Sequence, residues 1–346
     1  MPRVVSPRSL IVCRVYRNTI CTRPSSLSRL GVAGMRWFVK VALLLLVLAV
    51  GTGGAFGQSS PTFKGAVDVV ALNVVVVDKQ QQFISGLTAD NFAVYEDGVQ
   101  QELSFFAAGE VPLDLAILLD TSASMGNKLA TAQQAGVRFV SALRPVDRVL
   151  VVDIHDTSNI LAPLGSGVDA AKHAILRTSA RGGTALYNGL YMALKEMIRL
   201  RLGETDLRRQ ALVLLTDGED TRSLVSYDDV MELAKQSGIS IYTIVLGSKG
   251  FEQQHVARRH PTATRPEYGM KALAQETGAR SYFALEVGDL AGAYTSIGRE
   301  LANQYALGYT STNPRRDGAY RRVVVRILDR GGAQPRTRAG YLAPRG

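Results

Sequence analysis

Between residues 111 and 301, short apolar runs alternate with segments in which apolar residues recur every three or four positions. The first pattern is typical of buried strands and the second of helices packed by one face. Strands are predicted at 113–120, 147–154, 210–216, 239–246 and 280–285, with a short extended piece at 159–164. Helices are predicted at 127–143, 169–179, 186–200, 227–236, 267–276 and 289–301. This alternation predicts an α/β domain with a mostly parallel sheet that is covered on both faces.

The segments on either side, 59–110 and 302–346, follow a strand-like pattern instead. The turn residues Asp97-Gly98 predict a hairpin between 92–96 and 100–106. Each flank has too few strands to bury a sheet face alone. We therefore expect the two flanks to pair into one small β module beside the α/β domain, 111–301. The strands predicted in the flanks are 67–78, 92–98, 100–107, 304–310, 320–328 and 338–343.

Residues 1–57 have the pattern of a leader. From Met35 a basic segment precedes an apolar core of about ten residues and a run of small residues that ends at Gly57, as in a secretory signal peptide. We expect a signal at 35–57 and an exported protein that is periplasmic, secreted or attached to the envelope. Membrane anchoring is expected only if the signal stays uncleaved. Whether Met35 is the true start remains open.

The charge of +10 belongs largely to this leader, which holds eight basic residues and no acidic ones. The remaining chain has a net charge of +2, so no nucleic-acid partner is predicted. Residues 58–301 have a net charge of −5, whereas 302–346 have one of +7. Both cysteines, Cys13 and Cys21, also lie in the leader, which excludes thiolate chemistry and zinc–thiolate sites from the exported chain.

Oxygen-bearing side chains gather where predicted strands end. One strand ends in Asp120 and continues into Ser122 and Ser124, and another is followed at once by Asp217. A glycine-rich loop places Thr184 just before a helix. In open α/β sheets, ligands bind beyond the carboxyl ends of the strands. A set of carboxylates and hydroxyls without Cys or His favours a hard divalent cation.

Each of these features also has a simpler explanation. Ser124 and Thr184 are residue types that cap helices, and Asp217-Gly218 is typical of a turn. Three such features, all at strand-to-helix junctions on one face, favour a common metal site over separate caps. The four histidines have unrelated spacings and do not predict a zinc site.

The segments Asp120-Thr-Ser122-Ala-Ser124, Gly182-Gly183-Thr184 and Thr216-Asp217-Gly218 resemble the metal-ion-dependent adhesion site of von Willebrand factor A domains. The flanks resemble those of a bacterial group of secreted proteins with related domains. The resemblance implies a doubly wound, Rossmann-like sheet in the order 3-2-1-4-5-6.

The resemblance also implies roles for the site residues. Ser122 and Ser124 would contact the cation, and Thr184 would do so directly or through water. Asp120 and Asp217 would hold metal-bound waters. A carboxylate of a partner protein would fill the remaining position.

The sequence is thus interpreted as an exported, cation-dependent adhesion-type module that is not an enzyme. Mg²⁺ is the expected cation, with Mn²⁺ and Ca²⁺ as alternatives. Two other hypotheses stay open: a metal-stabilised envelope scaffold, and a metal-assisted hydrolase with Glu219 or Asp220 as its base. The long segment 248–267 is expected either to lie on the metal face or to be a solvated loop. Neither the partner's identity nor the oligomeric state follows from the sequence.

Overall fold

The computed structural model describes residues 69–109, 111–202, 207–218, 220–247 and 266–345. Residues 66–346 form one compact unit, and the preceding residues form another that lies outside the described part. The predicted signal peptide and most of segment 248–267 therefore fall on residues that are not described. No helix within the described ranges is long and apolar enough to cross a membrane.

The core of the fold is a six-stranded sheet with the strand order β10-β9-β8-β5-β6-β7. When the six strands are numbered 1 to 6 along the chain and the sheet is read from β7 to β10, the order is 3-2-1-4-5-6, as predicted. All neighbouring strands are parallel except the edge strand β7, which is antiparallel to β6. The strands are β5 (Leu113–Asp120), β6 (Arg148–Ile154), β7 (Ser158–Ala162), β8 (Arg209–Thr216), β9 (Ser240–Leu246) and β10 (Ser281–Ala284).

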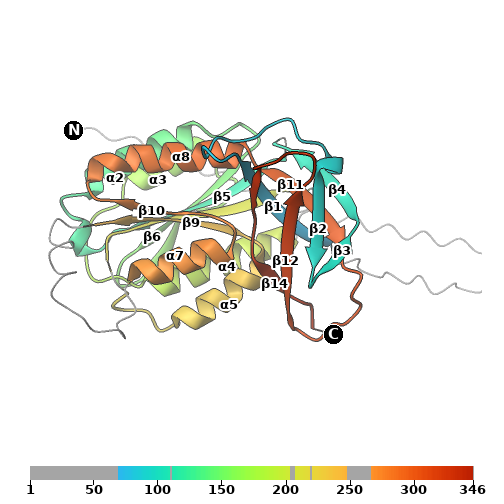
Figure 1. The fold of residues 1–346 in the computed structure, drawn as a ribbon. Coiled ribbons are helices and arrows are strands. Elements are labelled where there is room, and N and C mark those ends of the chain that lie inside the picture. The colour runs from blue at the N-terminus through green and yellow to red at the C-terminus, as the bar shows by residue number, and fades with distance from the viewer. Residues whose placement is uncertain (1–68, 110, 203–206, 219, 248–265, 346) are drawn as a thin grey trace, which may run out of the picture. The chain divides into compact units, whose positions relative to one another are not determined.

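Helices cover both faces of this sheet, as Figure 1 shows. One face packs against α2 (Leu129–Ser141), α3 (Val168–Leu176) and α8 (Leu290–Ala302). The other packs against α4 (Leu186–Leu202), α5 (Tyr227–Ser237) and α7 (Pro266–Glu276). Strand β5 has no exposed residue, and its side chains enter the two cores alternately. A central parallel strand reads as a continuous apolar run because it is buried on both faces.

The two flanks pair into a β module of two four-stranded antiparallel sheets, which confirms that prediction. One sheet has the order β13-β1-β11-β4, and the other has the order β14-β12-β2-β3. They share one apolar core. The strands are β1 (Val69–Val77), β2 (Phe92–Glu96), β3 (Val99–Gln101), β4 (Leu103–Ala108), β11 (Tyr305–Thr310), β12 (Tyr320–Ile327), β13 (Gln334–Arg336) and β14 (Gly340–Leu342).

The prediction of a single strand over 100–107 is wrong. The hairpin partner of β2 is the short strand β3, and after Glu102 the chain crosses to the other sheet as β4, where it pairs with β11. The Gln101 amide donates to Thr312 Oγ1 at 3.0 Å, and its oxygen accepts from Thr312 N at 2.9 Å. This corner depends on a contact between distant segments, so local alternation did not reveal it.

A buried charge network lies inside the β module. Glu96 and Arg321 are 2% and 3% exposed, and Glu96 Oε1 lies 3.2 Å from Arg321 Nη1. The other oxygen, Oε2, accepts from the hydroxyls of Tyr309 and Tyr341, each at 2.8 Å. Burial raises the pKa of Glu96, but hydrogen bonds from Ser311 and the two tyrosines, together with the Arg321 charge, leave it below its usual value. The network joins one flank to the other.

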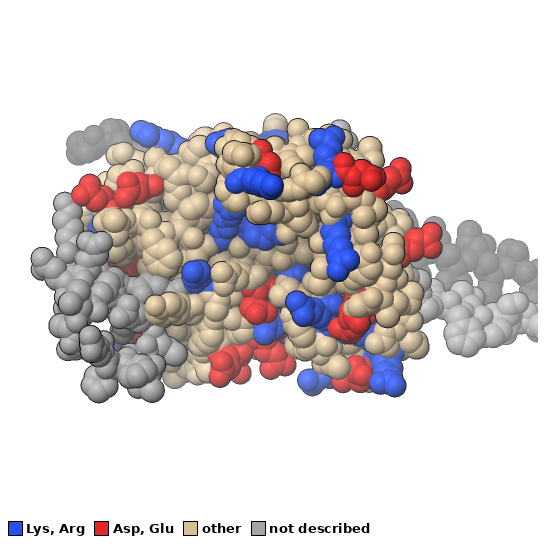
Figure 2. Space-filling model, viewed as in Figure 1, with Lys and Arg blue, Asp and Glu red and all other residues tan. Residues whose placement is uncertain are grey.

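Charges of both signs are interspersed on the face drawn in Figure 2, where neither Lys and Arg nor Asp and Glu form a continuous field. The segment 302–346, which has a net charge of +7, belongs to the β module. Several of these arginines meet at a cavity that is described below.

Candidate metal centre

Strands β5 and β8 are neighbours in the centre of the sheet and run parallel. Their carboxyl ends therefore meet at the same edge, which places Asp120 and Asp217 side by side at the start of two loops. This arrangement is the crevice in which ligands bind in open α/β sheets.

Asp120 is fully buried at the end of β5. Its Oδ1 accepts from Ser122 N at 2.9 Å, and its Oδ2 accepts from Thr216 Oγ1 at 2.7 Å. Burial raises the pKa of Asp120, and the nearby Asp217 carboxylate acts in the same direction, whereas hydrogen bonds from Ser122 and Thr216 oppose the shift. The side chain is thus fixed in orientation and lies close to a second acid.

Two serine hydroxyls connect the ends of these strands. Ser122 Oγ and Ser124 Oγ lie 2.9 Å apart, and Ser124 Oγ donates to Asp217 Oδ1 at 2.7 Å. Ser122 is buried beside Asp120, whereas Ser124 is exposed. Four of the five predicted ligands therefore form one continuous series of contacts.

Lys128 supplies a positive charge at this place. Its Nζ forms an ion pair with Asp217 Oδ2, the oxygen that Ser124 does not use. The Asp217 carboxyl is 1% exposed, and the Lys128 side chain is 19% exposed. The two acidic side chains thus have a neighbouring cation from the loop before α2.

Backbone hydrogen bonds hold the loop that contains Thr184 close to the segment that follows Asp120. Its loop is tied to the Asp120 segment by hydrogen bonds from Ala123 N to Gly182 O and from Arg181 N to Thr121 O. Gly182 has a φ of +65°, and a Cβ there would lie 2.0 Å from Asp156 Oδ2, so glycine is required. The structure brings the Thr184 loop to the site without a hydrogen bond from the Thr184 side chain to the other four predicted ligands.

The simpler capping explanation does not hold for Ser124. Helix α2 begins at Leu129 with Lys128 at its N-cap, which makes no side-chain cap bond. Asp217 accepts from Ser124 and Lys128 side chains.

The donors at this site are two carboxylates and three hydroxyls. No three His, Cys, Asp or Glu side chains of the described ranges gather in a metal-binding arrangement. His155 instead lies 3.0 Å from Arg181 and 3.6 Å from Asp153. An all-oxygen set of this kind fits Mg²⁺, Mn²⁺ or Ca²⁺ better than a softer metal.

Sequence reasoning missed several residues that position the site. Thr221 Oγ1 accepts from Thr184 N at 3.0 Å, and Thr221 N donates to Thr184 O at 2.9 Å. Asp156 Oδ1 accepts from Gly183 N at 2.8 Å. Asp220, which the sequence offered only as a candidate base, is half-buried and accepts from Tyr187 N and Ser223 Oγ. Only the nearness of Thr221 and Asp220 to Asp217 in the sequence offered a signal.

Replacement of Thr221 by valine is expected to speed hydrogen exchange of the Thr184 amide about fivefold. The variant removes the acceptor of that amide, and one such hydrogen bond contributes about 1 kcal/mol. Thr221→Ser keeps the hydroxyl and should leave the exchange rate near that of the wild type. Equal rates in all three proteins, measured by NMR, would show that Thr221 does not hold the loop.

Comparison with known proteins finds one family model that matches part of this chain. The profile of the family described as von Willebrand factor type A domain matches residues 115–219. A UPF0353 protein of Mycolicibacterium paratuberculosis is 26% identical over 227 residues, which cover 62% of this chain and 68% of that protein. A UPF0353 protein of Mycobacterium leprae is 25% identical over 227 residues, covering 61% of this chain and 65% of that protein. The match thus spans about two thirds of these relatives.

Among solved structures, a von Willebrand factor type A protein from Catenulispora acidiphila is similar. It is 15% identical, with a TM-score of 0.46, and the alignment covers 73% of this chain and 74% of that one.

Proposed function

We propose that this protein, whose residues 115–219 match the von Willebrand factor type A domain model, is a binding protein that acts through a divalent cation. Mg²⁺ is the first candidate, and its ligand set is Asp120, Ser122, Ser124, Thr184 and Asp217. The series of contacts from Asp120 through both serines to Asp217 carries this proposal. It gathers hard oxygen donors from two strand ends at one point.

Each residue of the site has a proposed role in binding the ion. The two serine hydroxyls would contact the cation, and Thr184 would do so directly or through water. Asp120 and Asp217 would balance its charge and orient its water molecules. When bound, the cation supplies a positive centre that accepts a carboxylate oxygen from a partner protein.

An enzymatic alternative finds little support among these side chains. A metal-assisted hydrolase needs a free general base near the ion. Asp220 is already an acceptor for Tyr187 N and for the Ser223 backbone and hydroxyl. Glu219 lies outside the described residues. We therefore propose a binding module, with no catalytic residue.

The scaffold alternative differs in one measurable respect. If the cation only stabilises the fold, chelation lowers thermal stability without affecting capture at a temperature where the protein stays folded. We expect the immobilised protein to retain envelope proteins of the producing cell with Mg²⁺ and to release them with EDTA. Asp217→Asn should behave like the chelated protein. Capture that is equal with Mg²⁺ and with EDTA supports the scaffold.

Replacement of Lys128 by methionine is expected to tighten Mg²⁺ binding three- to tenfold. Two unit positive charges about 4 Å apart repel by roughly 4 kcal/mol at an effective dielectric constant of 20, and the double charge of Mg²⁺ about doubles this repulsion. The repulsion is reduced because the partly exposed lysine can swing into solvent. Calorimetric titration measures the change, and Lys195→Met, an exposed change on α4, serves as the matched control. An unchanged affinity in Lys128→Met means that the ammonium does not compete with the ion.

Export remains part of the proposal and rests on the leader pattern at 35–57. An exported binding protein without cysteines in its folded part would be insensitive to an oxidising compartment. Mass spectrometry of the protein from its native cells would show whether the mature chain begins after Gly57.

A further inference from the structure

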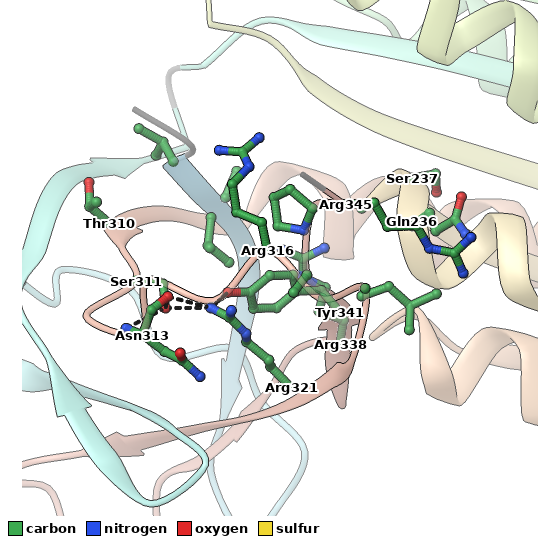
Figure 3. A pocket seen from close by; sticks show the side chains of 18 of the residues that line it. Gln236, Ser237, Thr310, Ser311, Asn313, Arg316, Arg321, Arg338, Tyr341 and Arg345 are labelled. Carbon is green, nitrogen blue, oxygen red and sulfur yellow. Dashed lines mark hydrogen bonds between the residues drawn. The ribbon is translucent and has the colours of Figure 1, made fainter. Parts of the chain in front are cut away.

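A cavity of about 1030 Å³ lies near the amino-terminal end of β8. The candidate metal centre lies at the opposite, carboxyl-terminal end of that strand. Its walls come from β1, the carboxyl ends of α4 and α5, and the segments around β11 and β14 (Figure 3). No Asp or Glu among the described residues lines it. The arginines that line it are Arg201, Arg315, Arg316, Arg321, Arg338 and Arg345.

Arg321 and Arg201 have partners within the protein that account for their charge or orientation. Arg321 is paired with Glu96 and also donates to Ser311 Oγ at 2.8 Å. Arg201 Nη1 donates to Ser237 O at 2.6 Å, at the carboxyl end of α5. A helix carboxyl end attracts a cation but supplies only a partial charge. Arg201 therefore has a fixed position and no carboxylate partner among the described residues.

Among the arginines of the cavity, Arg338 has a donor without an acceptor in the described structure. Its Nε is shielded from solvent and has no hydrogen-bond partner among the described residues. Its guanidinium lies 5.3 Å from the ring centroid of Tyr341. At Gly238, just after α5, a Cβ would come within 3.1 Å of Arg338 Nη1, so the glycine lets the guanidinium approach the helix end. Burial lowers the pKa of Arg338 to about 10, and Arg201 acts in the same direction.

Arg338 is only partly exposed, and a partly buried guanidinium without an anion is costly, because a buried charge is stabilised mainly by a paired group of opposite charge. Arginine also presents a planar fork of donors that matches a carboxylate or a phosphate. The rest of the lining includes apolar side chains, among them Leu202, Leu207 and Leu342. The cavity volume is close to the upper end for small-molecule sites, about 300–1,000 Å³.

We propose that this cavity binds a small organic anion with at least two oxyanion groups, phosphate or carboxylate, through Arg338 and Arg201. The guanidinium groups receive the oxyanions, and the leucines contact the carbon part of the ligand. The remaining arginines of the positively charged tail add to the attraction. This site is independent of the proposed cation site, which lies at the opposite ends of the strands.

The test uses pyrophosphate and tricarballylate as probes of the two oxyanion types, with the full chain in metal-free buffer. NaCl at matched ionic strength controls for general screening. At ten times its dissociation constant, a specific ligand should raise the melting temperature by about 3–5 °C. Arg338→Gln and Arg201→Gln should each weaken binding at least about tenfold. Arg326→Gln removes the same charge from β12 outside the cavity lining and should bind like the wild type.

Binding of pyrophosphate alone assigns a phosphorylated ligand, binding of tricarballylate alone assigns a polycarboxylate, and binding of both supports the shared chemistry. If Arg338→Gln does not fold, the effect of Arg201→Gln on probe binding still tests the proposal. The proposal is overturned if neither probe exceeds the NaCl control, or if Arg201→Gln and Arg326→Gln weaken binding equally. It is also overturned if binding appears only after Glu204→Gln and Asp206→Asn, because the chain's own acids would then fill the cavity.

Discussion

Replacement of Glu96 by glutamine is expected to lower the free energy of unfolding by about 3 kcal/mol at pH 7. The substitution keeps the volume but leaves the buried Arg321 guanidinium without its anion. Breaking a buried ion pair by removing one partner typically costs 3–5 kcal/mol. Because Glu96 also accepts from Tyr309 and Tyr341, the loss extends to hydrogen bonds that hold the two flanks together. Urea denaturation measures the difference.

The effect should depend on pH with a definite sign. The pKa of Glu96 lies below its ordinary value of 4.5, so between these two values the folded state binds fewer protons than the unfolded state. The stabilisation is thus fully present above pH 4.5 and is lost as the pH falls through the folded pKa. Glu102→Gln, an exposed change, should alter stability by less than about 0.5 kcal/mol. If the difference in the free energy of unfolding between the wild type and Glu96→Gln does not become smaller in acid, this explanation is wrong.

Replacement of Asp120 by asparagine is expected to weaken Mg²⁺ binding at least about 100-fold and to abolish the rise in melting temperature that the cation produces. The side chain is buried and held in place by Ser122 N and Thr216 Oγ1, so no other carboxylate can take its position. Loss of a group that orients a metal ligand commonly costs 10–100-fold in affinity, and here a negative charge is lost as well. Thermal denaturation with and without Mg²⁺ measures the effect.

The matched control is Asp114→Asn, at the other end of the same strand. Asp114 is buried and paired with Arg148 and Arg208, so this variant should lose stability yet keep its affinity for Mg²⁺. The metal-free Asp120→Asn protein should melt within a few degrees of the metal-free wild type, because the substitution also removes the repulsion from Asp217. Equal Mg²⁺ affinity in Asp120→Asn and the wild type would remove Asp120 from the ligand set.

The architecture was predictable because its strongest signals are local. Strand β5 and strand β8 are apolar runs whose ends are marked by Asp120 and Asp217, and helical spacing identified the helices between them. The order of the strands came from the family resemblance. The split between β3 and β4 was missed because Gln101 and Thr312 meet across more than 200 residues of sequence.

Sequence patterns proposed the members of the candidate site but gave no indication of their neighbours. Asp120, Ser122 and Ser124 are close in sequence and follow one strand, so a short pattern revealed them. The ion pair between Lys128 and Asp217 joins two loops, and no spacing rule connects them. The same holds for Glu96 and Arg321, which meet only when both flanks fold together. Contacts of this kind depend on tertiary packing, which local patterns do not encode.

The decisive measurement of cation binding is electron paramagnetic resonance with Mn²⁺, because it counts the ions held by the protein. We expect one bound Mn²⁺ per chain, displaced by Mg²⁺ and absent in Asp120→Asn, with a spectrum that changes when a carboxylate-bearing peptide is added. Absence of bound Mn²⁺ at millimolar concentrations, or binding that Asp120→Asn leaves unchanged, would contradict this expectation.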